Sequence, residues 1–143
     1  MPKKQTLLFL SFLIFLTACP KEPIWYNIFV INTTQSNHLK IFINPENPGD
    51  SLLPLDKKIF DTGLKNFNAE HSTSFRICMH KIRGIRDCIE SQPGQKIFLF
   101  VFDADTLATY DYSIIREEKR YKERVEIPYT MATNRSDLRI EYP

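Results

Sequence analysis

The chain has 143 residues, of which 43% are hydrophobic and 25% are charged. It carries 19 basic and 17 acidic side chains, but Lys3 and Lys4 lie in an N-terminal segment that we expect to be removed, which leaves 17 of each sign. A domain without net charge has no general electrostatic attraction for nucleic acid or for anionic lipid. Nucleic acid is therefore not expected as a partner.

The N-terminal segment has the order of features of a secretory signal. Two lysines precede an apolar run over residues 6–16, and small residues follow it up to Cys19. The apolar run of about 11 residues is too short to cross a hydrocarbon core, which takes about 20 residues in a helix. The segment is therefore predicted to be a targeting signal.

The tetrapeptide Leu16-Thr17-Ala18-Cys19 resembles the lipobox of bacterial lipoproteins. The resemblance implies cleavage after residue 18, a diacylglycerol on the sulfur of Cys19, and a location at the cell envelope on the outer membrane. Burial of acyl chains contributes about 0.8 kcal/mol per CH₂, so several chains hold a protein on a bilayer. The alternatives are an ordinary signal peptide and an uncleaved membrane anchor. Removing 18 of the 143 residues leaves 125, enough for one domain: a tether over 19–23 and a globular domain over 24–143.

The first half of that domain is predicted to contain a hairpin and a loop. Residues 24–31 are dense in aromatic and β-branched residues, residues 38–44 alternate, and turn-forming residues separate them. Residues 44–50 contain two prolines, a glycine and three Asn or Asp residues, which predicts a loop. Residues 51–70 show no clean period, so we expect irregular structure with one short strand over 57–61.

Residues 74–91 allow two interpretations. Apolar positions from Phe75 to Ile89 recur at steps of three and four, which predicts a helix. The alternative is a hairpin that turns at Arg83-Gly84 and places Cys78 opposite Cys88, where a disulfide could form. In the helix these two cysteines are about 15 Å apart along the axis, beyond disulfide reach. The helix is preferred, and the two cysteines are expected to remain unpaired.

The remaining chain predicts one buried strand, a short helix and two further strands. Residues 96–102 form a continuous apolar run of strand length, which is typical of a central strand buried on both faces. Residues 110–120 predict a short helix, and residues 121–127 and 138–142 predict strands. The fold class is therefore α+β and β-rich, with about five mostly antiparallel strands and one or two helices. The alternative is a β-sandwich with an inserted helix.

Four segments of the mature chain are similar to a group of uncharacterised small lipoproteins of Bacteroidales-type bacteria. The segments are Asn32-Thr33-Thr34, residues 48–54 (Pro-Gly-Asp-Ser-Leu-Leu-Pro), residues 100–107 and residues 138–143. The sequence departs from that group at Tyr112, where a Trp is expected. The resemblance supports the location and implies no activity.

One segment suggests an enzyme. The order from Phe100 to Leu107 resembles the first motif of haloacid dehalogenase phosphatases, which implies Asp103 as nucleophile, Asp105 as acid/base, and a bound Mg²⁺. However, Thr106 follows Asp105 without the usual intervening residue, and too few residues follow for the rest of such a site. The structural interpretation is that both aspartates end the strand and accept backbone N–H groups in the turn after it.

No other set of residues predicts chemistry. His38, His71 and His80 have no paired spacing with each other or with cysteine, so neither a metal site nor a cofactor is expected. The sequence therefore predicts a lipid-anchored cell-envelope domain that binds or scaffolds without catalysis. Its expected partners are the membrane, through the lipid on Cys19, and an envelope protein or glycan. The alternatives are a metal-dependent phosphohydrolase that uses Asp103 and Asp105, and an accessory subunit of an outer-membrane assembly.

Overall fold

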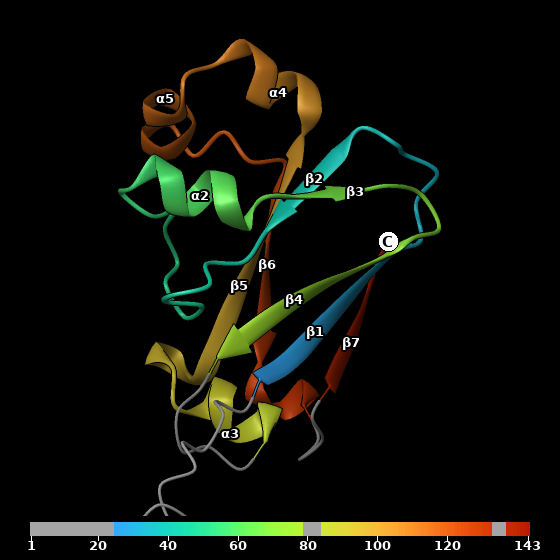
Figure 1. Ribbon diagram of the computed structural model, residues 1–143, viewed down its shortest axis with the longest axis vertical. Helices are drawn as coiled ribbons and strands as arrows, with labels where there is room; N and C mark the ends of the chain where they lie inside the picture. The colour runs from blue at the N-terminus through green and yellow to red at the C-terminus, as the bar shows by residue number, and fades with distance from the viewer. Residues whose placement is uncertain (1–24, 79–83, 133–136) are drawn as a thin grey trace, which may run out of the picture.

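The computed structural model of the chain describes residues 25–78, 84–132 and 137–143 (Figure 1). Within these residues the chain forms seven strands, four α-helices and two short 3₁₀ helices. In chain order they are β1 (Trp25–Asn32), β2 (Leu39–Phe42), α2 (Lys57–Gly63), β3 (Lys65–Phe67), β4 (Ser72–Cys78), α3 (Ile85–Glu90), η1 (Pro93–Gln95), β5 (Lys96–Asp103), α4 (Ala104–Thr109), α5 (Tyr112–Glu117), β6 (Glu123–Pro128), η2 (Tyr129–Met131) and β7 (Asp137–Tyr142).

The strands form two sheets, with the orders β4-β1-β7 and β3-β2-β5-β6. Every pairing is antiparallel except that of β1 with β7, the first and last strands, which run parallel. The predicted α+β, β-rich and mostly antiparallel class is confirmed. The described residues contain more strands and helices than the five strands and one or two helices expected, because β3, β4, α3 and α4 were not resolved as separate elements from the sequence pattern.

The second sheet is buried on both of its faces. Along β5, Ile97, Leu99 and Val101 join the larger core, which also contains residues of β1, β4, β7 and α3. The alternate residues Phe98, Phe100 and Phe102 join a second core together with Phe60 of α2 and Tyr112 of α5. The molecule therefore has three layers, namely the first sheet, the second sheet, and the helices α2 and α5 (Figure 1). This arrangement confirms the prediction of a central strand buried on both faces.

The predicted hairpin of residues 24–31 with 38–44 is wrong. Both segments are strands, but β1 pairs with β4 and β7, whereas β2 pairs with β3 and β5 in the other sheet. β1 ends at buried Asn32, whose Nδ2 donates to the carbonyl oxygen of Phe67 in β3 at 2.9 Å. Because both edges of β1 are taken by strands distant in sequence, the local turn carries the chain from one sheet to the other.

The predicted strand at residues 57–61 is also wrong, because this segment forms the helix α2. Asp56 caps its start by accepting a bond from the backbone N–H of Lys58 at 2.8 Å, and Lys57 pairs with Asp61 one turn later. Phe60 and Gly63 occupy the buried side. A single helix of two turns with one large buried apolar residue is too short to show a clear period in the sequence.

The helix predicted over residues 74–91 is wrong for the first half of that segment, which is a strand. The alternative hairpin turning at Arg83-Gly84 is wrong for the second half of the segment, which is a helix. Residues up to Cys78 form β4, in which Phe75 and Ile77 are buried while Ser74 and Arg76 are exposed. Residues 85–90 form α3, with Ile85, Cys88 and Ile89 buried. The apolar residues at steps of three and four thus belong to two different elements. Residues 79–83 lie outside the described part of the chain.

The other predictions for this part of the chain are confirmed. The loop at 44–50 contains no helix or strand, α5 lies within the helix predicted over 110–120, and β6 and β7 match the strands predicted over 121–127 and 138–142. In β7, Leu138, Ile140 and Tyr142 are buried and the residues between them are exposed. The alternation that predicted the strand therefore reflects one buried face.

Candidate functional site

The loop of residues 44–56 connects β2 to α2 and has no regular secondary structure, but hydrogen bonds fix its backbone. Three Asx side chains shape its backbone. Asn44 Oδ1 accepts bonds from the backbone N–H groups of Glu46 and Asn47 at 3.1 and 3.2 Å, and Asp50 Oδ1 accepts one from Leu52 at 3.0 Å. Asp56 then caps α2. Such side-chain bonds fix turns that no strand or helix would support.

Four carbonyl groups of this loop are held by the rest of the molecule. The carbonyl of Pro48 accepts a bond from the backbone N–H of Phe98 in β5 at 2.9 Å. The other three accept bonds from side chains of β6 and α5. The pairs are Ser51 with Arg124 Nη1 (3.1 Å), Leu53 with Arg116 Nε (3.2 Å) and Pro54 with the hydroxyl of Tyr112. Irregular segments of about this length are usually either functional or disordered, and this one is fixed at four points.

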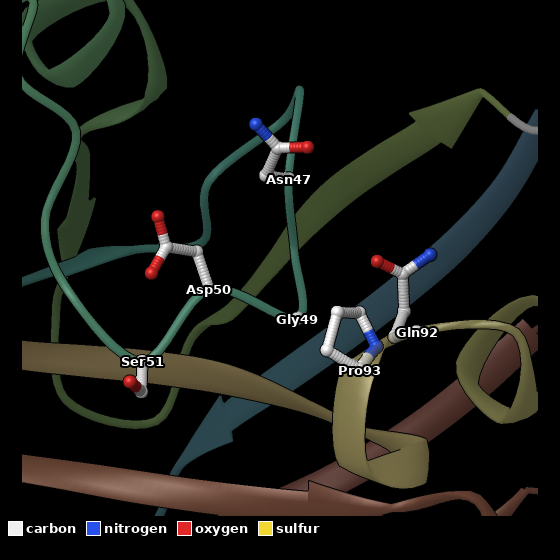
Figure 2. A pocket seen from close by; sticks show the side chains of 6 residues that line it. All are labelled: Asn47, Gly49, Asp50, Ser51, Gln92 and Pro93. Atoms are coloured by element: carbon white, nitrogen blue, oxygen red, sulfur yellow. The ribbon is translucent and has the colours of Figure 1, made fainter.

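Two hollows adjoin along the loop, and Asn47 and Asp50 line both of them. The first has a volume of about 350 Å³ and lies between the loop and η1 (Figure 2). Figure 2 shows Gly49 next to Gln92 and Pro93 at the edge of this hollow. A Cβ atom at Gly49 would lie 2.7 Å from Cβ of Gln92, so only glycine allows this close approach.

The second hollow, of about 340 Å³, lies between the loop and the helices α2 and α5. It combines apolar and acidic groups with one cation. The apolar residues are Leu52, Leu53, Pro54, Leu55 and Ile59, the acidic ones are Glu46, Asp50 and Asp56, and the cation is Arg116. Leu52 and Leu55 are 46% and 82% exposed, which makes them two of the four large hydrophobic residues exposed in the described part of the chain. Asn44 and Asn47 also line it, so the hollow has both the apolar wall and the polar groups that binding sites combine.

A third hollow, of about 190 Å³, opens where β3 and β4 approach each other. Ile43, Phe75 and Ile77 line it together with Lys65. The ammonium group of Lys65 donates to the carbonyl of Ser74 and lies 5.2 Å from the centre of the Phe75 ring. This cation is thus occupied by groups of the protein itself.

The two aspartates of the phosphatase-like motif lie on two adjoining elements. Asp103 ends β5 and Asp105 lies in the first turn of α4. Asp103 makes no side-chain capping bond, contrary to the structural interpretation from sequence, and instead its Oδ1 lies 3.2 Å from Nζ of Lys122. Neither aspartate lines any of the three hollows. Within residues 25–78, 84–132 and 137–143, no group of three His, Cys, Asp or Glu side chains is placed to hold a metal ion.

The cysteines have different environments. Cys19 lies outside the described residues. Cys88 is a free thiol on the buried face of α3, fully buried in the larger core, and burial raises its pKa to about 12. Such a thiol is inert at neutral pH because the thiolate is the reactive form. The expectation that Cys88 forms no disulfide with Cys78 agrees with this state, although the predicted helix that motivated it is absent.

Across the described residues, no helix combines the length and apolar character needed to cross a bilayer. The chain matches no protein-family model, no curated protein and no solved structure. The fold and the site define a class, namely a three-layer α+β domain. Its partly apolar surface loop is held in place by hydrogen bonds to its carbonyl groups.

Sequence analysis missed this loop as a site, although two signals were present. Residues 48–54 were among the segments that resemble the small lipoproteins, and Leu52, Leu53 and Leu55 stood among turn-forming residues without a period. A hydrophobic cluster that fits neither a strand nor a helix indicates either irregular core or exposed apolar surface. Here it is both, because Leu53 is buried while Leu52 and Leu55 are exposed.

Proposed function

We propose that the chain is a lipid-anchored domain of the bacterial cell envelope that binds a partner through the 44–56 loop and performs no catalysis. One observation carries the binding role: an irregular loop is held in one conformation by four carbonyl anchors while it exposes Leu52 and Leu55 beside a hollow. Ordering a loop before binding lowers the entropy cost of association. Exposed apolar groups next to polar ones are typical of protein contact sites.

The membrane anchor rests on the N-terminal sequence, where Leu16-Thr17-Ala18 precedes Cys19. The arrangement of the elements is compatible with such an anchor. In Figure 1, β1 begins at the end of the molecule where α3 lies, whereas α2 and α5 lie toward the opposite end. A tether attached before β1 would therefore join the molecule at the end opposite α2 and α5.

Two experiments test the proposal separately. For the anchor, cells that express the chain are fed an alkyne analogue of palmitate, and Cys19→Ser is the variant. We expect the label and membrane sedimentation to depend on Cys19, and unprocessed precursor to accumulate in the variant. Equal labelling of the variant would contradict lipidation at this residue.

For the binding surface, a photo-crosslinking amino acid replaces Leu55 in cells, with the same substitution at Met131 as matched control. Met131 is 52% exposed but belongs to η2, away from the loop. We expect a discrete adduct from position 55 and none from position 131. Adducts from both positions, or from neither, would contradict a binding role of the loop. An adduct with a protein of the outer membrane would place the chain in an envelope assembly.

A further inference from the structure

We infer that the hollow between the 44–56 loop, α2 and α5 accepts a polypeptide segment that carries an apolar side chain flanked by basic residues. This inference rests on the proposed binding function and adds the chemistry of the partner. It follows from the apolar and acidic residues that line the hollow and from the interactions that the nearby cations already make.

The apolar part of the hollow fits an apolar side chain. Leu52 and Leu55 are exposed at its rim, while Leu53 is only 4% exposed at its base. The carbonyls of Leu53 and Pro54 are held by Arg116 and Tyr112, so this wall has a fixed shape. The volume of about 340 Å³ lies in the usual range for ligand sites, about 300–1,000 Å³. A partner that covers both leucines would remove the largest exposed apolar group of the loop from water.

The charged groups of the hollow favour a basic partner. Glu46, Asp50 and Asp56 line it and are exposed, against a single cation, Arg116. Arg116 already donates from Nε to the carbonyl of Leu53. Among the nearby lysines, Lys57 forms an ion pair with Asp61 on its own helix, and neither Lys57 nor Lys58 lines the hollow. The excess of carboxylates gives electrostatic complementarity to Lys or Arg side chains.

The same charges argue against other occupants. Three carboxylates would repel the phosphates of an anionic lipid surface or of a nucleic acid. None of the residues that line this hollow is aromatic, so a sugar ring would find no ring to stack on. A polypeptide with an apolar anchor and flanking basic groups satisfies both the leucines and the carboxylates.

The test uses the purified full chain and three short fluorescent peptides in anisotropy titrations. The first peptide combines leucine and lysine, the second has glutamate in place of each lysine, and the third has serine in place of each leucine. We expect the first to bind at least about tenfold more tightly than either of the others, with an affinity that falls as salt is raised.

Two variants locate the binding, each with a matched control. Leu52→Ser with Leu55→Ser is expected to weaken binding at least about tenfold, whereas Met131→Ser leaves it unchanged. Glu46→Gln with Asp50→Asn and Asp56→Asn keeps the acceptor oxygens, and is expected to weaken binding and reduce its salt dependence. The control for charge removes the same number of carboxylates by Glu90→Gln with Asp105→Asn and Glu141→Gln, all exposed and outside the hollow.

The outcomes separate this inference from the proposed function. Tighter binding of the glutamate peptide, with loss of binding in the double leucine variant, would overturn the inference and leave the loop as the binding surface. The inference would also be overturned if no peptide bound, or if the lysine peptide bound both loop variants with the affinity that it has for the native chain. In each of these cases, the photo-crosslinking at position 55 tests the proposed function independently.

Discussion

The hydroxyl of Tyr112 in α5 donates a hydrogen bond to the carbonyl of Pro54, 58 residues earlier in the chain. The ring of the same tyrosine packs against Phe60 with 4.6 Å between the ring centres. One side chain therefore joins the helical layer to the candidate binding loop. Its apolar part belongs to the second core, and its polar end fixes the loop.

We expect Tyr112→Phe to lower the free energy of unfolding by about 1–3 kcal/mol, because it retains the ring packing but leaves the buried carbonyl of Pro54 without a donor. Hydrogen exchange should also speed up in the 44–56 loop. Urea unfolding and exchange measured by mass spectrometry check these effects. Tyr121→Phe is the matched control, since the ring of Tyr121 packs on Phe100. Equal losses in both variants would contradict a specific role of the bond to Pro54.

The stability of the fold is expected to fall between pH 10 and 12. Burial is the main cause that raises the pKa of Tyr112, and likewise that of Tyr142, to about 12, whereas the unfolded value is about 10. Below pH 10 both states are protonated and the full stability is present. Between pH 10 and 12 only the unfolded state ionises, so stability is lost as the pH rises through the folded pKa. Urea midpoints at pH 9 to 12 should decline less steeply for Tyr112→Phe than for the native chain, and identical slopes would refute the assignment.

Cys88 is expected to resist alkylation in the native protein, because its thiol is buried and has a pKa of about 12. Iodoacetamide at pH 8 should modify it only in denaturant, as read by peptide mass. Cys88→Ala identifies the adduct.

We further expect both Cys78 and Cys88 to be modified in denaturant without reductant. If both stayed protected until a reductant was added, a disulfide between them would be established instead.

Gly49→Ala is expected to destabilise the fold by about 1–3 kcal/mol, because the added methyl group would lie 2.7 Å from Cβ of Gln92 and 3.0 Å from Cδ of Pro93. The loop would have to move away from η1 to relieve this overlap. Asn47→Ala, an exposed position of the same loop, is the control and should change stability by less than about 0.5 kcal/mol. Thermal unfolding of the two variants checks the difference, and a tolerated alanine at position 49 would show that the loop is not held against η1.

The double replacement Asp103→Asn with Asp105→Asn is expected to leave stability within about 1 kcal/mol of the native value. Among the described residues, the ion pair that it removes is that of Asp103 with Lys122, whose side chains are 45% and 48% exposed. The purified native chain should release no phosphate from an aryl phosphate in the presence of Mg²⁺. Turnover that disappears in Asp103→Asn would instead establish the phosphohydrolase.

The sequence by itself determined those elements whose pattern is local. The continuous apolar run of residues 96–102 required burial on both faces, and the structure places Leu99 in one core and Phe100 in the other. The alternation in residues 138–142 likewise determined which side of β7 faces the core. These patterns suffice because successive side chains of a strand point to opposite faces whatever the strand pairs with. The α+β class followed from them.

Only the tertiary structure decided the partners of each element. The aromatic and β-branched residues of 24–31 could not show that β1 would lie between β4 and β7, because backbone pairing does not depend on distance along the sequence. The candidate site depends on the same kind of long-range contact. The turn residues of the 44–56 loop predict irregular structure, but its conformation is set by donors from Phe98, Arg116 and Arg124, which the folded sheet and helix bring to it.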